Sequence, residues 1–110
     1  RRDFTYVDDV IEGLWRVLTL PPAVEQELPF RIFNIGHNRP VEMRLFVQLL
    51  ERLLGRTAKV ELLPPLPTEM QETCADLTRI HAAVGYAPQV SLEDGLRRFI
   101  DWFRSYYGFV

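Results

Sequence analysis

Residues 30–36, FRIFNIG, decide the fold class that the sequence predicts. The stretch combines aromatic and β-branched residues in a short run that a glycine closes, which is typical of a β-strand. Apolar side chains at Phe30, Ile32, Phe33 and Ile35 would fall on both faces of that strand. Such a strand needs neighbours on both sides, as in the buried parallel sheet of an α/β protein. We therefore predict an α/β fold in which this chain is a piece of something larger.

The flanking sequence predicts two helices and a second strand. Apolar residues recur at helical spacing from Val10 onward, which predicts a helix over residues 9–19. We expect Asp8 and Asp9 to cap its N-terminus. A longer amphipathic pattern ends at Gly55, a residue type that often caps a helix C-terminus. Residues 57–64, TAKVELLP, alternate in the manner of a short strand. The expected structure is mostly helical with two or more short strands, since a two-stranded sheet is rarely stable alone.

The last third of the chain predicts two further helices. The first is short, with Asp76 as its cap and Gly85 at its end. The second begins after Ser91, a favourable N-cap, and runs to about residue 107. Its buried stripe is expected to consist of Leu92, Leu96, Phe99, Ile100 and Phe103. We expect its aromatic end to pack in the core: Trp102, Phe103, Tyr106 and Tyr107.

Composition narrows the classes of function. The chain has 110 residues, of which 47% are hydrophobic and 25% charged, as in one globular domain, and its net charge is -2. This slight acidity argues against a nucleic-acid partner, which normally needs a basic face. No apolar run approaches the length that spans a bilayer, so we expect no membrane partner and a cytoplasmic location. Cys74, the single cysteine, excludes an internal disulfide and is expected to be a buried thiol.

Four side chains are of types that bind metal ions, but their positions in the sequence do not favour a metal site. Asp8 and Asp9 form an adjacent acidic pair, but capping of the following helix explains them more simply. His37 and His81 have no partners at ligand spacing, and we expect a loop residue and a helix-surface residue. We therefore predict no metal site.

Three long segments together resemble one family. They are residues 2–18, RDFTYVDDVIEGLWRVL, residues 33–51, FNIGHNRPVEMRLFVQLLE, and residues 75–107, ADLTRIHAAVGYAPQVSLEDGLRRFIDWFRSYY. Their order and spacing resemble the extended short-chain dehydrogenase/reductases that modify nucleotide sugars, in particular epimerases of the UDP-glucuronate 4-epimerase kind. The likeness covers essentially all 110 residues.

The resemblance implies that residues 1–110 are a single C-terminal nucleotide-sugar-binding domain. In such enzymes an N-terminal Rossmann domain binds NAD through a glycine-rich GxxGxxG turn, and a YxxxK pair supplies the catalytic tyrosine and lysine. Neither motif occurs here, because no tyrosine of the chain is followed four residues later by lysine. The resemblance therefore implies that this chain contains no catalytic residue and neither holds NAD nor transfers a hydride.

The resemblance also implies where the substrate binds. The arginine of the RDFTYVDD segment, Arg2 here, would reach the diphosphate of a UDP-sugar. An acidic residue in the loop before residue 75, Glu69 here, would accept hydrogen bonds from the nucleotide ribose. Leu66 departs from the family, because members usually have a polar residue at that position. The predicted substrate-binding residues are therefore Arg2 and Glu69.

The implied function is inversion at C4 of a UDP-sugar such as UDP-glucuronate, by an enzyme that is commonly a homodimer. A nucleotide-sugar 4,6-dehydratase, a decarboxylase or another epimerase is an alternative within the family. From a different class, the chain would be a non-catalytic interaction module in which the altered loop reflects lost sugar binding. In either case the unpaired stretch at residues 30–36 predicts exposed apolar surface and self-association of the isolated chain.

Overall fold

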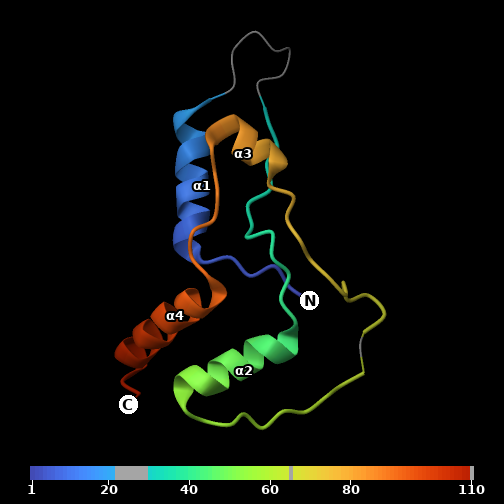
Figure 1. The fold of residues 1–110 in the computed structure, drawn as a ribbon, viewed down its shortest axis with the longest axis vertical. Coiled ribbons are helices and arrows are strands. Elements are labelled where there is room, and N and C mark those ends of the chain that lie inside the picture. Colours follow the sequence, from blue (N-terminus) through green and yellow to red (C-terminus); the bar gives the residue numbers. More distant parts are fainter. Residues whose placement is uncertain (22–29, 65, 110) are drawn as a thin grey trace.

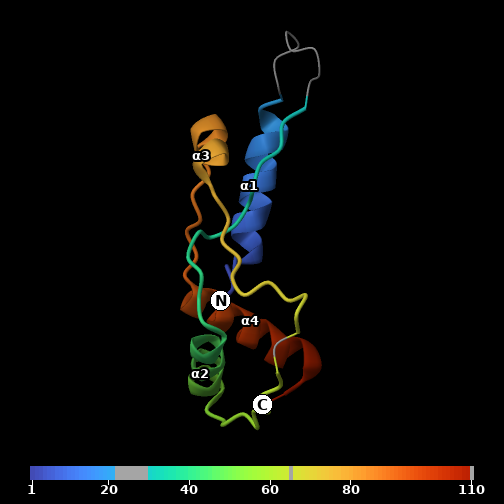
Figure 2. The same cartoon turned by 90° about the vertical axis from the view of Figure 1, so that its right-hand side faces the viewer.

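The computed structural model describes residues 1–21, 30–64 and 66–109, and these ranges contain four helices joined by extended segments (Figure 1). The helices are α1 (Val7–Thr19), α2 (Met43–Leu54), α3 (Thr78–Val84) and α4 (Leu92–Tyr107). Two orthogonal views place α1 and α3 at one end and α2 and α4 at the other (Figures 1 and 2). The radius of gyration is 17.7 Å, whereas a compact domain of this length has about 13 Å. The arrangement is therefore open.

The prediction of two or more strands is wrong for the described part of the chain. Residues 30–36 and 57–64 form no strand. The β contact that the described residues make is one isolated antiparallel bridge, in which Arg2 and Val41 exchange backbone hydrogen bonds of 2.9 and 2.8 Å. A strand is stabilised by pairing with its neighbours, and local propensity cannot supply those neighbours. The helical part of the predicted α/β fold is what the structure contains.

The predicted helix ends are mostly confirmed. Gly55 and Gly85 follow α2 and α3 in the left-handed conformation, with φ of 66° and 65°. Ser91 caps α4 by accepting a hydrogen bond from the backbone N–H of Asp94 at 3.1 Å. The capping predictions for α1 and α3 are wrong, because Tyr6 and Leu77 occupy the two N-cap positions and neither makes a side-chain cap.

The small core lies between α1, α3 and the segment that follows α3. Its buried members are Ile80, Val84 and Tyr86, against which Val17, Phe33, Ile35 and Leu77 pack. Gly13 lets α1 approach closely, since a Cβ atom there would lie 3.1 Å from the ring of Tyr86. The burial of this core fixes the end of the molecule that contains α1 and α3.

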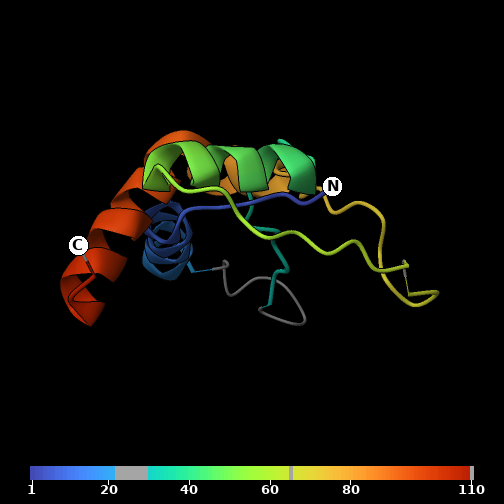
Figure 3. The ribbon, with the colours of Figure 1, turned by 90° about the horizontal axis from the view of Figure 1, so that it is seen from below.

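At the other end, α2 packs against α4, as the view from below shows (Figure 3). Phe4, in the segment before α1, stacks on Phe46 of α2 with ring centroids 4.4 Å apart. A mostly apolar cavity of about 350 Å³ lies between these elements, lined by Tyr6, Leu50, Leu96 and Phe99 among others. The first residues of the chain therefore connect the two ends of the molecule.

Several residues that the sequence places in the core are exposed. Of the apolar stripe on α1, Ile11 is 58% and Leu18 74% exposed. Leu96 and Ile100 of α4 are buried as predicted, but the following residues are exposed: Phe99, Trp102, Tyr106 and Tyr107. The aromatic end of α4 instead packs on itself, with Trp102 and Tyr106 stacked at 5.4 Å. Cys74 is exposed as well. These predictions were wrong because amphipathic spacing identifies an apolar face without showing that the chain covers it.

None of the helices in the described ranges has both the length and the hydropathy needed to cross a bilayer.

Candidate functional site

Arg2 and Glu69, the two predicted substrate-binding residues, lie together although 67 positions separate them. Nη2 of Arg2 lies 3.2 Å from a carboxylate oxygen of Glu69, and Nη1 donates to the backbone carbonyl of Met70 at 2.6 Å. A cavity of about 160 Å³ adjoins them, lined by Arg1, Arg2, Met43, Glu69, Met70 and Gln71. Leu66, the residue that departs from the family, is 66% exposed. The structure thus assembles a cation and a carboxylate beside one small cavity.

A second ion pair ties the same loop to the start of the chain. Arg1 lies 3.3 Å from a carboxylate oxygen of Glu72, and it donates to the carbonyl of Pro40 at 3.3 Å. The loop therefore meets residues 1–2 through two arginines and two glutamates, whose formal charges cancel. Chemically, a guanidinium offers paired planar donors to phosphate oxygens, and a carboxylate accepts from hydroxyl groups.

Asp3 is a site residue that the sequence analysis missed. Its carboxylate accepts hydrogen bonds from three backbone N–H groups: Asn38 at 3.0 Å, Arg39 at 3.1 Å and Ala75 at 2.9 Å. Burial opposes its ionisation, but the backbone N–H groups outweigh burial and hold the pKa of Asp3 below its usual 3.8. In the sequence, the position of Asp3 next to Arg2 was the one sign that it belongs to the site. Its hydrogen-bond partners could not be identified from the sequence, because they lie 35 to 72 residues away.

Gly36 permits the close approach that Asp3 requires. A Cβ atom at Gly36 would lie 2.3 Å from Cβ of Ala75 and 2.8 Å from a carboxylate oxygen of Asp3. The carbonyl of Gly36 accepts a hydrogen bond from the hydroxyl of Tyr86 at 3.0 Å. Burial raises the pKa of that hydroxyl above its usual 10.0, and the negative charges of Asp9 and Asp3 add to this effect. A neutral, donating Tyr86 therefore links the core to the site.

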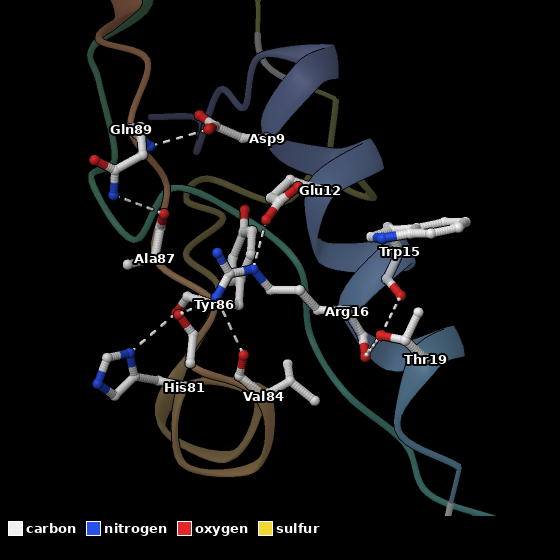
Figure 4. A network of polar contacts seen from close by, with 11 residues as sticks. Asp9, Glu12, Trp15, Arg16, Thr19, His81, Val84, Tyr86, Ala87 and Gln89 are labelled. Carbon is white, nitrogen blue, oxygen red and sulfur yellow. Dashed lines mark hydrogen bonds and ion pairs between the residues drawn. The ribbon is translucent and has the colours of Figure 1, made fainter.

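A separate polar network joins α1 to the segment after α3 (Figure 4). Asp9 is 5% exposed and accepts from the backbone N–H groups of Gln89 and Val90, both at 3.0 Å. Arg16 donates to the carbonyls of Val84 and Gly85 at 3.3 and 3.1 Å. These bonds hold α1 against the end of α3 and the segment that follows it, so the network orients elements of the fold.

The four residues weighed as metal ligands do not converge. Asp8 contacts Arg98 at 3.3 Å, whereas Asp9 turns to the opposite segment. His81 lies 3.1 Å from the carbonyl of Tyr86, to which its Nδ1 donates. Across residues 1–21, 30–64 and 66–109, no group of three or more possible metal ligands is found.

The N-termini of α1 and α4 do not suit the pyrophosphate of NAD. A pyrophosphate normally binds at a helix N-terminus, where free N–H groups and the helix dipole attract negative charge. The first turns of α1 and α4 carry acidic side chains instead, Asp8 and Asp9 in α1 and Glu93 and Asp94 in α4. These side chains would repel a pyrophosphate at the two helix N-termini.

Comparison with known proteins confirms the resemblance. The chain is 36% identical to a UDP-glucuronate 4-epimerase of Arabidopsis thaliana over 96% of its own length, and 33% identical to that of Thermodesulfobacterium geofontis over 92%. It covers 26% and 29% of those two relatives. The chain thus spans about a third or less of the length of these curated relatives. No protein-family model matches the chain.

Solved structures show the same similarity in three dimensions. The UDP-glucuronic acid 4-epimerase of Bacillus cereus, in complex with UDP-glucuronic acid and NAD, superposes with a TM-score of 0.80 at 30% identity. The match covers 96% of this chain and 32% of that one. The backbone described above is therefore similar to part of a nucleotide-sugar epimerase.

Proposed function

We propose that this chain is the nucleotide-sugar-binding, C-terminal part of an NAD-dependent 4-epimerase that acts on a UDP-sugar such as UDP-glucuronate. The proposal rests on one observation above all, the meeting of Arg2 and Glu69 beside a common cavity. The relatives named UDP-glucuronate 4-epimerase, and the neighbour solved with UDP-glucuronic acid, support the choice of substrate. The homodimer and the cytoplasmic location stay predictions.

Arg2 would bind the diphosphate and Glu69 the ribose. In the structure Arg2 donates to Glu69 and to the carbonyl of Met70, and its side chain is 31% exposed. A phosphate oxygen carries more charge than a carbonyl and is the stronger partner for a guanidinium. When Arg2 turns to the phosphates, the carboxylate oxygen of Glu69 that it held becomes free to accept from ribose hydroxyls. By exchanging Glu69 for the phosphates, Arg2 would thus make its own contact and free Glu69 for the ribose.

The chain would hold the sugar and would not perform the redox step. Oxidation and reduction at C4 need NAD, which the resemblance places in an N-terminal Rossmann domain. The catalytic tyrosine and lysine that the resemblance implies are not in this sequence. We accordingly assign binding and orientation of the substrate to these residues and assign them no other step.

Calorimetric titration of the protein with UDP and with UDP-glucuronate tests the proposal. We expect Arg2→Ala to weaken both ligands about 10- to 100-fold, because charge-assisted hydrogen bonds contribute about 1.5–3 kcal/mol. Arg97→Ala is the matched control, since Arg97 is also exposed and paired, with Glu93 and Asp94 on α4. Binding that Arg2→Ala leaves unchanged, or no binding by the wild type, would favour the non-catalytic interaction module instead.

A further inference from the structure

Asp3 joins three segments at one carboxylate. One oxygen accepts from the N–H of Arg39, and the other accepts from the N–H groups of Asn38 and Ala75. The backbone N–H of Asp3 donates in turn to the hydroxyl of Thr73 at 3.1 Å. The start of the chain, the turn before α2 and the segment before α3 are therefore held at fixed spacing.

These are the segments that carry the candidate site. Arg2 precedes Asp3 directly and forms the isolated bridge with Val41, two residues beyond Arg39. Thr73 and Ala75 directly follow the loop that contains Glu69 and Glu72. The N–H of Thr73 also donates to the carbonyl of Arg1 at 3.2 Å. A change in how Asp3 is held would thus alter the position of Arg2 relative to Glu69.

We propose that Asp3 is a positioning residue for nucleotide binding, which sets the separation of Arg2 and Glu69 by clamping residues 38–39 and 73–75 onto the start of the chain. The inference rests on the proposed function of Arg2. Asp3 itself does not contact the ligand; it acts through Arg2.

The clamp requires a carboxylate. Two oxygens with no hydrogen can accept from three N–H groups at once, whereas an amide has one oxygen and an NH₂ group that would face a backbone donor. In Asp3→Asn, therefore, at least one of the bonds to Asn38, Arg39 or Ala75 is lost. The shape of the side chain is kept, so the change removes the clamp without opening a cavity.

A double-mutant cycle tests the role, with the dissociation constant of UDP measured on the protein. We expect Asp3→Asn to weaken UDP about 10-fold in the wild-type background. In the Arg2→Ala background we expect the same change to alter affinity less than about twofold, because the group through which Asp3 acts is gone. The melting temperature should fall in both backgrounds, and by more when Arg2 is present, because its bonds to Glu69 and Met70 are then disturbed as well. Asp8→Asn, which changes an exposed carboxylate in the first turn of α1, is the control and should leave affinity unchanged.

A second variant keeps the test valid if Asp3→Asn does not fold. Thr73→Val removes the hydroxyl that Asp3 contacts and leaves the carboxylate in place. We expect it to weaken UDP about 3-fold, again only when Arg2 is present.

Two results would overturn the role of Asp3. One is a folded Asp3→Asn protein that binds UDP as the wild type does while Arg2→Ala does not. The other is a loss of affinity that is equal in both backgrounds, which would mean that Asp3 acts without Arg2. If Arg2→Ala itself leaves UDP binding unchanged, the proposed function fails and this inference fails with it.

Discussion

The centre of the molecule and its outer helix faces are organised in opposite ways. At the centre, polar side chains such as Asp3 satisfy backbone groups from distant segments, and Tyr86 joins this network to the small buried core. On the outer faces of α1 and α4, large apolar side chains such as Leu18 and Trp102 are exposed, at 74% and 52%.

The difference teaches that this chain builds its candidate site without burying most of its apolar surface. Backbone N–H groups need partners wherever they are buried, so the loops converge on the carboxylates of Asp3 and Asp9. The apolar faces need only some other surface to cover them, and contiguous exposed apolar patches mark contact sites. The hydrogen bonds that arrange the site therefore do not depend on the burial of the outer apolar helix faces.

We expect the largest loss of stability from a substitution at the centre of the molecule. Tyr86→Ala removes a fully buried ring and its hydrogen bond to Gly36, and we expect the free energy of unfolding to fall by about 3–5 kcal/mol. Trp102→Ala removes a larger ring from the exposed face of α4, and we expect the free energy of unfolding to fall by less than about 1 kcal/mol. Urea denaturation of both variants measures the contrast. Equal losses would show that the two regions do not differ in burial.

We expect a smaller effect on stability from the ionisation of Asp3, which tests the polar contacts at the centre. The pKa of Asp3 is lowered in the folded state, so its contribution to stability is complete above its unfolded value of 3.8. That contribution should be lost as the pH falls from 3.8 through the folded pKa, because the unfolded chain binds the proton first. Tyr86, which the charge of Asp3 influences, titrates far above this range.

The measurement is the free energy of unfolding at a series of acidic pH values. The acid slope should be shallower in Asp3→Asn than in the wild type. An unchanged slope in that variant would mean that other carboxylates carry the acid dependence.

The smallest expected effect on stability concerns the outer face of α1. Leu18→Ser should change the free energy of unfolding by less than about 0.5 kcal/mol, because Leu18 is 74% exposed. It should nevertheless reduce self-association of the isolated chain, which the exposed apolar side chains at Leu18, Phe30 and Ile32 favour. Sedimentation velocity over a range of concentrations compares the self-association of the wild-type chain with that of Leu18→Ser. A wild-type chain that stays monomeric throughout would contradict the predicted self-association.

The sequence predicted what depends on neighbouring residues and on family resemblance. Gly55, Gly85 and Ser91 marked helix ends because capping is set within a few residues. Arg2 and Glu69 came from the resemblance; the structure places them 3.2 Å apart, and their binding roles stay predictions.

What it could not predict depends on distant partners. The strand at residues 30–36 needed neighbours that the described residues do not supply. Asp9 was assigned to its own helix, yet it accepts from Gln89 and Val90, 80 and 81 positions away. Asp3 was missed for the same reason, because a pattern of residues does not show which distant N–H groups a carboxylate will meet.

The cancelling charges at the start of the chain have a kinetic consequence. Arg1 and Arg2 face Glu72 and Glu69, so these four side chains together add little net charge that would attract an anion from a distance. Recognition of a diphosphate would then begin only at contact, and the encounter rate should vary little with ionic strength.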